Sequence, residues 1–453
     1  MKVSEINRHL AAGDIDVDAI LPHLAEYNTK SIPLPFEFGL KELPTEPGII
    51  SVRGPRQYGK STWLESCIAD TIEEYGPGSA FYLNGDEVAT QEELLKIIAE
   101  LVPSFSKKTK VKRLFIDEIT AVTDWEIALK RAADQRIIKN ILVVTTGSKA
   151  FDIRRGHERL PGRKGKLAKT DYIFLPCSYR AFYTNVYREF RGDSWKYYLL
   201  TGGSPFAANE IYHTEIMPEF VRQITRDWIL GEIVMSGRNR TMLTNIMRCI
   251  VKFGGTPVGY AKLARESGLA NNTVASGYIE QLADLMCVIP SWQFDQDRKI
   301  PILRKPCKFP MINLSAAMSF HPNAPRSIWD FDQLGDKDLG IFFEWAVAQE
   351  LWRRRILKGL ELSEELMFWK SEKHELDFID ENGDFVEVKS GPASPLEFNW
   401  FPKVFPKKKL TVICTTPFET EFVTGLTLHQ FLLRDPYFSA YVTDVPEDPD
   451  REI

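Results

Sequence analysis

The spacing of apolar residues between positions 45 and 182 predicts buried strands that alternate with helices. An apolar run at 48–52 predicts one strand, and Leu64, Ile68 and Ile72 then recur at helical spacing. Further short apolar runs predict strands within the sequences SAFYLNGDE, VKRLFIDEI and NILVVTTGS. This alternation favours a parallel sheet whose ligands bind at the carboxyl ends of the strands.

The segment after residue 255 has the pattern of a helix-turn-helix. A helix is expected at 260–267, with a turn at Gly268 and a second helix capped by Asn271 or Asn272. Apolar residues within 289–302, interrupted by the sequence QFDQDRK, predict a hairpin. These elements together predict a winged helix.

Near the C-terminal end, the sequences ELDFI and DFVEV alternate with period two, which predicts two strands with one buried face each. A two-residue Asn-Gly turn would mix apolar and charged residues on the same face. A three-residue turn at 381–383, with its glycine left-handed, shifts the pairing by one position and leaves the apolar face unbroken. We therefore predict the second register, which places Asp377 opposite Glu387 and Glu375 opposite Lys389.

Composition narrows the class of protein. The chain has 453 residues, and 44% of them are hydrophobic and 26% charged, as in globular proteins of roughly three domains. The formal net charge of -5 excludes a wholly basic nucleic-acid coat, so any DNA contact would be a local patch. The six scattered cysteines favour reduced thiols in a cytoplasm over disulfides or a zinc site. Neither a signal peptide nor a membrane-spanning run is recognisable in the sequence.

The sequence GPRQYGKS at 54–61 fits the G-x-x-x-x-G-K-[ST] pattern of a phosphate-binding loop. Its glycines let backbone N–H groups face phosphates, and the following helix adds its positive N-terminal end. Lys60 can reach the β- and γ-phosphates, and the Ser61 hydroxyl can coordinate Mg²⁺. We therefore predict ATP and Mg²⁺ as cofactors. The expected nucleotide-binding residues are Gly54, Pro55, Arg56, Gln57, Tyr58, Gly59, Lys60, Ser61, Thr62, Asp117 and Thr146.

Polar residues at the ends of two other predicted strands complete an ATPase site. The sequence LFIDE ends in Asp117, expected to hold Mg²⁺ through water, and Glu118, expected to orient the attacking water. The strand within NILVVTTGS ends in Thr145, Thr146 and Ser148, where a γ-phosphate sensor would lie. Hydrolysis of ATP is therefore predicted, with Glu118 and Lys60 as catalytic residues.

The stretch 151–169 is rich in arginine and lysine, and three interpretations of it stay open. It is a solvated loop, or Arg163 reaches a γ-phosphate in its own or a neighbouring subunit of a homo-oligomer, or the stretch binds nucleic-acid phosphates.

DNA binding by the predicted winged helix also stays open. Its second helix carries the polar residues Asn271, Asn272, Thr273 and Ser276 but no arginine or lysine, which is weak chemistry for reading DNA. Lys262 and Arg265 on the preceding helix are the best candidates for phosphate contacts. The alternative is a structural or protein-contact role.

The predicted hairpin near the C-terminal end carries candidate metal chemistry. Asp377 and Glu387 would repel each other unless a cation or a shared proton lay between them. Two converging carboxylates beside Lys389 suit a Mg²⁺-dependent phosphodiesterase, because carboxylates bind a hard cation and the ammonium can orient water. The alternative is an exposed charged face with one surface ion pair.

From about residue 45 to 430 the ordered motifs resemble the prokaryotic AAA-type P-loop ATPases that carry a winged helix and a C-terminal restriction-endonuclease-like domain. The motifs are GPRQYGKST, LFIDE, TTGS, the LPGR run, LTGGSP, KFPMINLS, GIFFEWAVAQEL and ELDFI…VEVKSG. The resemblance implies ATPase positions at Lys60, Ser61, Asp117 and Glu118. It also implies a nuclease-like set made of Glu344, Asp377, Glu387 and Lys389. The metal ligands so implied are Ser61 and Asp117 at the first site and Glu344, Asp377 and Glu387 at the second.

The resemblance and the spacing together predict an α/β chain of five segments. These are N-terminal leader helices (1–44), a P-loop core with a parallel sheet (45–182), a helical lid broken by LTGGSP (183–240), a winged helix (241–320) and an α/β restriction-endonuclease-like domain (321–453). One hypothesis is an ATPase acting on DNA, with an ATP-gated, Mg²⁺-dependent nuclease domain. The other is an ATP-switched regulatory protein whose nuclease-like domain only binds DNA or a protein partner.

Overall fold

The computed structural model describes residues 2–148, 162, 165–186, 192–360 and 366–438. The chain forms two compact units, Met1–Leu175 and Pro176–Ile453, and each is described by itself. Among the described residues, every helix is too short or too polar to span a membrane.

The first unit contains a five-stranded parallel sheet in the order β2-β3-β4-β1-β5. Its strands are β1 (Gly48–Arg53), β2 (Ala80–Asn84), β3 (Arg113–Asp117), β4 (Leu142–Gly147) and β5 (Asp171–Ile173). Every residue of β1 and β4 is buried, as expected for a parallel sheet covered on both faces. The predicted parallel sheet is therefore confirmed, with β5 as an additional edge strand.

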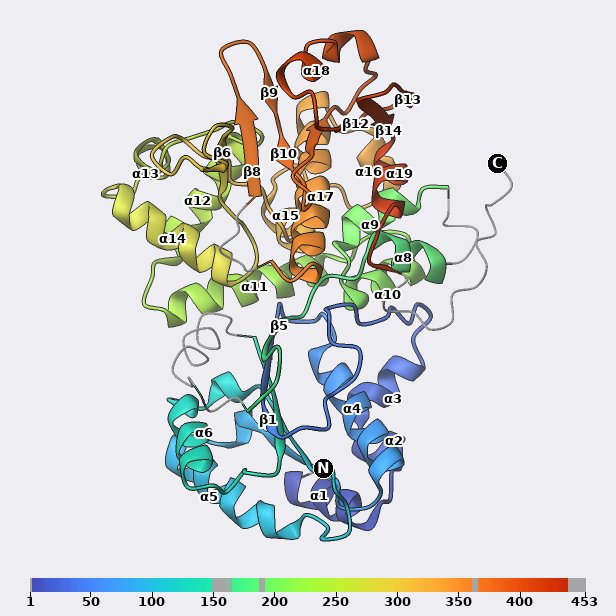
Figure 1. Ribbon diagram of the computed structural model, residues 1–453, viewed down its shortest axis with the longest axis vertical. Coiled ribbons are helices and arrows are strands. Elements are labelled where there is room, and N and C mark those ends of the chain that lie inside the picture. The colour runs from blue at the N-terminus through green and yellow to red at the C-terminus, as the bar shows by residue number, and fades with distance from the viewer. Residues whose placement is uncertain (1, 149–161, 163–164, 187–191, 361–365, 439–453) are drawn as a thin grey trace. The chain divides into compact units, whose positions relative to one another are not determined.

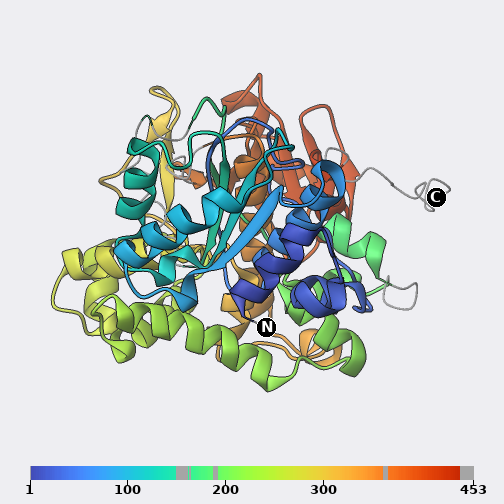
Figure 2. The ribbon, with the colours of Figure 1, turned by 90° about the horizontal axis from the view of Figure 1, so that it is seen from below.

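Helices cover both faces of this sheet (Figures 1 and 2). The helix α4 (Lys60–Tyr75) follows β1 and contacts β2 and β3, while α5 (Gln91–Leu101) and α6 (Trp125–Asp134) pack together on the opposite face. The other helices in the described part of this unit are α1 (Val3–Ala12), α2 (Val17–Ile20), α3 (Pro22–Asn28) and the 3-10 turns η1 (Gly85–Glu87), η2 (Val102–Ser104) and η3 (Ile119–Ala121).

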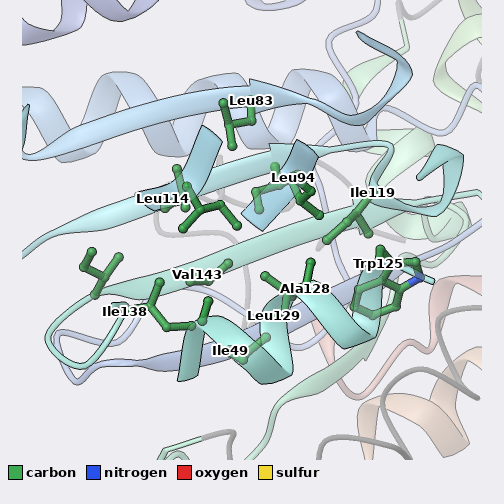
Figure 3. Packing of buried hydrophobic residues seen from close by; sticks show 14 of the residues in the cluster. Ile49, Leu83, Leu94, Leu114, Ile119, Trp125, Ala128, Leu129, Ile138 and Val143 are labelled. Atoms are coloured by element: carbon green, nitrogen blue, oxygen red, sulfur yellow. The ribbon is translucent and has the colours of Figure 1, made fainter. Parts of the chain in front are cut away.

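A continuous apolar core lies between the sheet and the pair α5–α6 (Figure 3). Alternate strand residues, among them Ile49, Leu114 and Val143, point into this core and meet Leu94 of α5 and Leu129 of α6. Burying one such side chain contributes about 1.5–3 kcal/mol. The core therefore fixes the strands against one another, and with them the polar residues at their carboxyl ends.

The N-terminal helix α1 covers the edge of the sheet at β2. The Asn7 amide nitrogen donates to the carbonyl oxygen of Tyr82 (2.8 Å), and its amide oxygen accepts from the Tyr82 N–H (2.8 Å). This side chain takes the place of a neighbouring strand at one residue, which protects an edge that would otherwise offer unpaired backbone groups.

Helices open the second unit. They are α8 (Tyr179–Asn185), α9 (Ser194–Thr201), α10 (Pro205–Thr214) and α11 (Glu219–Met235). The LTGGSP sequence separates α9 from α10, and its Gly202 and Gly203 have φ angles of 62° and 75°. A Cβ on Gly202 would lie 2.4 Å from the backbone nitrogen of Ser315, so the break requires glycine.

The helix-turn-helix follows as predicted. Its elements are α12 (Arg240–Lys252), α13 (Tyr260–Ser267), α14 (Asn272–Asp284) and the antiparallel hairpin of β6 (Ser291–Asp295) and β7 (Ile300–Pro301). Gly268 ends α13 with a φ of 73°, and the Asn271 side chain caps α14 by accepting from the Val274 N–H (3.0 Å). The predicted helices, cap and hairpin are confirmed at these positions.

Two further sheets form in the described part of the second unit, in the orders β7-β6-β8-β9 and β10-β11-β12-β14-β13. The remaining strands are β8 (Leu366–Lys370), β9 (Glu375–Leu376), β10 (Phe378–Ile379), β11 (Phe385–Val388), β12 (Leu410–Ile413), β13 (Phe418–Glu419) and β14 (Val423–Leu426). The remaining helices are α15 (Leu314–Phe320), α16 (Ile328–Asp332), α17 (Asp336–Leu357), η5 (Pro395–Phe398), α18 (Phe401–Val404) and α19 (Leu428–Leu433). Because β6 pairs with β8, the predicted winged-helix and nuclease-like segments share one sheet.

Candidate nucleotide site and carboxylate–lysine cluster

The loop between β1 and α4 makes close approaches that only glycine permits. A Cβ on Gly54 would lie 2.8 Å from the carbonyl oxygen of Phe174, and one on Gly59 would lie 2.8 Å from a ring carbon of Phe36. Gly59 also has a φ of 96°. The helix α4 begins at the next residue, Lys60, so the loop leads directly into a helix N-terminus, where phosphate is favoured.

The Lys60 side chain is buried beneath this loop. Its ammonium donates to the carbonyl oxygens of Gly54 (3.0 Å) and Pro55 (2.8 Å). Burial lowers the pKa of Lys60, and the nearby carboxylates of Glu118 and Asp117 oppose that effect. The loop, its lysine and the two predicted acidic residues therefore lie together at one end of the sheet.

The other predicted loop residues differ in exposure. Arg56 and Gln57 are exposed, and Ser61 and Thr62 are partly buried. Tyr58 is only 3% exposed. We therefore expect Tyr58 to meet a nucleotide through its backbone and Ser61 through its hydroxyl.

Asp117 at the end of β3 is tied to the end of β4. The Thr146 hydroxyl donates to Asp117 Oδ1, and the backbone N–H of Glu118 donates to the same oxygen (3.1 Å). Thr145 differs, since its hydroxyl donates to the Ile50 carbonyl oxygen (3.2 Å) inside the sheet. Thr146 is therefore at the candidate site, while Thr145 joins two strands.

The Glu118 carboxylate is held by Ser148. Its Oε2 accepts from the Ser148 backbone N–H (3.2 Å) and from the Ser148 hydroxyl (3.1 Å). Glu118 itself has a φ of 44°, an uncommon conformation for a residue other than glycine. A Cβ on Gly85 would lie 2.4 Å from the Glu118 carbonyl oxygen, so the chain packs tightly around this conformation.

These residues fit ATP and Mg²⁺. The glycine loop leaves room for phosphates against backbone N–H groups, and Lys60 supplies a positive charge. Ser61 and Asp117 offer the oxygen ligands that Mg²⁺ prefers. Arg163 lies outside the described residues, so its predicted role stays a prediction.

The hairpin of β10 and β11 has the predicted register. Phe378 pairs with Val386, the backbone of Asp380 bonds that of Asp384 (2.8 Å), and Gly383 has a φ of 78°. The three-residue turn is therefore confirmed. In this register Asp377 and Glu387 are the two residues that lie directly beyond the pair Phe378 and Val386.

The strand pairing changes at Asp377. β9, before it, pairs with β8, whereas β10, after it, pairs with β11, so the two strands belong to different sheets. The Asp377 Oδ2 atom accepts from the Val388 N–H (2.9 Å) where the strand ladder would have continued. The chain thus turns its carboxylate inward at the junction of two sheets.

A lysine with no predicted role, Lys308, lies at the centre of the acidic residues. The Lys308 ammonium lies 2.7 Å from Asp377 Oδ1, 2.9 Å from Glu375 Oε1 and 3.7 Å from Glu344 Oε1. Its side chain is only 1% exposed. We call Lys308, Glu344, Glu375 and Asp377 the carboxylate–lysine cluster.

Glu387 and Lys389 lie beside this cluster and pair with each other (2.6 Å). Burial, and then repulsion from Asp377, raises the pKa of Glu387 to about 8. Burial likewise raises the pKa of Glu344 to about 7. A pocket of about 430 Å³ is lined by residues that include Glu344, Glu375, Asp377, Glu387 and Lys389, so all four predicted nuclease-like residues meet in one place.

The prediction that Glu375 pairs with Lys389 is wrong. Glu375 contacts Lys308 and Lys370 instead (2.9 Å and 2.6 Å), because β9 belongs to the other sheet. Lys308 stands 69 positions before its closest partner, and only its place in the KFPMINLS motif could have drawn attention to it.

The comparison with known protein families matches the part of the chain that contains the candidate nucleotide site. A family model described as an AAA domain matches residues 46–183. No protein with a curated description matches the chain in sequence.

Several solved structures are similar to the chain at low sequence identity. The Walker-type ATPase Paby2304 of Pyrococcus abyssi is 12% identical, with 68% of this chain and 96% of that chain covered and a TM-score of 0.43. The ORC2 protein of Aeropyrum pernix is 11% identical, with 60% and 86% covered and a TM-score of 0.36. A RuvB variant of Thermotoga maritima is 16% identical, with 53% and 81% covered and a TM-score of 0.30. Residues 46–183 thus match the model of an AAA domain, and the same residues contain the P-loop and the parallel sheet of a P-loop α/β core.

Proposed function

We propose that the chain binds ATP with Mg²⁺ at the 54–61 loop and hydrolyses it. The observation that carries this proposal is the position of the Glu118 carboxylate, which Ser148 holds at the strand end next to Asp117 and Lys60. A fixed carboxylate beside a phosphate-binding lysine is the arrangement that orients water for attack on a γ-phosphate.

Each residue has a role in this proposal. Lys60 exchanges its two loop carbonyl partners for phosphate oxygens, and Ser61 and Asp117 hold Mg²⁺. Glu118 orients the attacking water, and Thr146 senses the γ-phosphate through its contact with Asp117. Arg163, in this chain or in a second copy, is proposed to reach the γ-phosphate.

Single-turnover and steady-state measurements of ATP hydrolysis test the ATPase proposal. Glu118→Gln is expected to lower kcat about 100-fold or more while ATP still binds, and Lys60→Ala is expected to weaken binding itself. Glu100→Gln, an exposed carboxylate on α5, serves as the matched control. Unchanged turnover in Glu118→Gln would show that another group orients the water.

We propose that the second unit responds to nucleotide by binding DNA or a protein partner, in a cytoplasmic setting that the scattered cysteines favour. Arg265 on α13 has a side chain that is 75% exposed, and Lys262 lies on the same helix. The nuclease hypothesis instead needs Mg²⁺ between Asp377 and Glu387, and each of these carboxylates already has a lysine partner, Lys308 for Asp377 and Lys389 for Glu387. The regulatory alternative is therefore the better supported of the two.

A plasmid assay with Mg²⁺ or Mn²⁺, with and without ATP, separates these alternatives. The regulatory proposal predicts no cleavage by the natural chain, together with DNA retention that falls in the Lys262→Gln/Arg265→Gln double variant. Cleavage that disappears in Asp377→Asn would establish the nuclease instead. A natural chain that neither cleaves nor retains DNA would point to a protein partner.

A further inference from the structure

In the carboxylate–lysine cluster, three carboxylates surround one positive charge, as they would around a bound cation. Here the positive charge is the ammonium of Lys308. An ammonium has three N–H donors, and the Lys308 ammonium faces three carboxylates from separate places: Glu344 on α17, Glu375 on β9 and Asp377 at the sheet junction. The charge is nearly sealed from solvent, since only 1% of the Lys308 side chain is exposed.

The position of Lys308 is fixed by its backbone as well. Its N–H donates to the Ser291 carbonyl oxygen (2.9 Å), and its carbonyl oxygen accepts from the Ser291 N–H (2.8 Å). The ammonium also lies 5.5 Å from the centre of the Phe368 ring, a favourable cation–π distance. Lys308 is therefore built into the sheet of β6 and β8, and its ammonium is not the end of a loose surface side chain.

Most carboxylate oxygen atoms of Asp377 and Glu387, which a metal would need as ligands, already bond to groups of the protein. Asp377 uses Oδ1 for Lys308 and Oδ2 for the Val388 N–H, and Glu387 uses Oε1 for Lys389. Glu387 Oε2 is buried without a hydrogen-bond partner, and Glu344 meets Lys308 only at 3.7 Å, so these two carboxylates are held less firmly than Asp377. Mg²⁺ demands near-octahedral oxygen ligands at about 2.0–2.1 Å. Over the described part of the chain no group of three or more His, Cys, Asp or Glu residues is arranged to hold a metal, so the predicted set does not fit one.

We infer that Lys308 is the resident cation of this cluster and stands where a metal-dependent nuclease-like site would hold a divalent ion. The cluster then keeps its geometry without a metal ion. A ligand could therefore enter the adjacent pocket without a metal ion between it and the carboxylates. This inference does not rest on ATP hydrolysis, because it concerns the second unit in the absence of nucleotide.

Titration of the nucleotide-free, full-length protein with Mn²⁺, with free Mn²⁺ followed by electron paramagnetic resonance, tests the inference. The natural chain and Asp377→Asn are expected to bind the same amount of Mn²⁺, because the cluster takes none. Lys308→Met is expected to gain one Mn²⁺ site, with an affinity at least tenfold higher than that of any Mn²⁺ binding by the natural chain. Adding Asp377→Asn to this variant should remove the new site. Lys403→Met, an exposed lysine on α18, is the matched control and should behave as the natural chain does.

One result overturns the inference: the natural chain binds one Mn²⁺ that Asp377→Asn abolishes. A Lys308→Met variant that binds no more Mn²⁺ than the natural chain would also count against it. Should Lys308→Met fail to fold, thermal unfolding of the natural chain decides. A melting temperature that is the same in EDTA and in excess Mn²⁺ supports the resident lysine, and a rise with Mn²⁺ that Asp377→Asn removes refutes it.

Discussion

The Asp377 carboxylate accepts a hydrogen bond from the backbone N–H of Val388 at the point where pairing between β10 and β11 ends (2.9 Å). Its second oxygen meets the Lys308 ammonium (2.7 Å). One side chain thus replaces a missing rung of the strand ladder and also neutralises a buried charge. Removing Lys308 takes the cation away from Asp377 and its neighbouring carboxylates, and removing Asp377 takes the nearest of three carboxylates away from a buried ammonium, so either change is costly in a protein interior.

Lys308→Met should lower the free energy of unfolding of the second unit by about 3–5 kcal/mol, because it leaves buried carboxylates without their cation. Urea denaturation followed by tryptophan fluorescence measures this change. Lys370→Met removes the other lysine that contacts Glu375, but the Lys370 side chain is 49% exposed. We expect that variant to cost less than about 1 kcal/mol. An equal loss of unfolding free energy in the two variants would mean that the burial of Lys308 does not strengthen its contribution to stability.

The stability of the second unit should depend on the ionisation of Glu387. Burial raises the pKa of Glu387 from 4.5 to about 8. Between these values the folded state keeps a proton that the unfolded state releases, so stability falls as pH rises through this window and levels off above it. Below pH 4.5 the carboxyl is protonated in both states, and its full contribution to stability is present.

Glu387→Gln mimics the protonated form and should flatten the fall in melting temperature between about pH 4.5 and 8. Glu372→Gln changes an exposed carboxyl on the turn between β8 and β9 and should leave the slope as it is. An unchanged slope in Glu387→Gln would assign the pH dependence to another buried group, with Glu344 as the next candidate because its pKa is about 7.

Local patterns in the sequence predicted much of this structure. Apolar runs indicated four of the strands in the first sheet, and an unbroken apolar face selected the three-residue turn at 381–383. The strands and the turn both depend on residues that are close together in the chain, so hydrophobic periodicity and turn geometry are enough to predict them.

Long-range partners could not be predicted in the same way. The register of a hairpin fixes which residues oppose each other within it, but it does not reveal that the chain changes sheets at Asp377. That change directs Glu375 away from Lys389 and toward Lys308. No spacing rule links Lys308 to Asp377, 69 positions away, and a lysine between apolar residues is more simply explained as a surface charge.

Ser148→Ala should lower ATP turnover about tenfold or more and leave the KM for ATP nearly unchanged. The Ser148 hydroxyl donates to the Glu118 carboxylate (3.1 Å), so its loss would let the proposed water-orienting group move. Steady-state kinetics that separate kcat from KM provide the measurement. Ser106→Ala, after η2, is the control and should change neither value. A rise in KM alone would place Ser148 in nucleotide binding and not in the orientation of Glu118.

Asn7→Ala should destabilise the first unit by about 1–3 kcal/mol, because it leaves the N–H and the carbonyl oxygen of Tyr82 without their side-chain partner. The effect should be local, so amide hydrogen exchange at Tyr82 should accelerate more than exchange in β4 at the centre of the sheet. Arg8→Ala, an exposed change on the same helix, is the control and should leave that rate as it is. Equal acceleration throughout the sheet would instead mean that Asn7 supports the whole unit and not its edge.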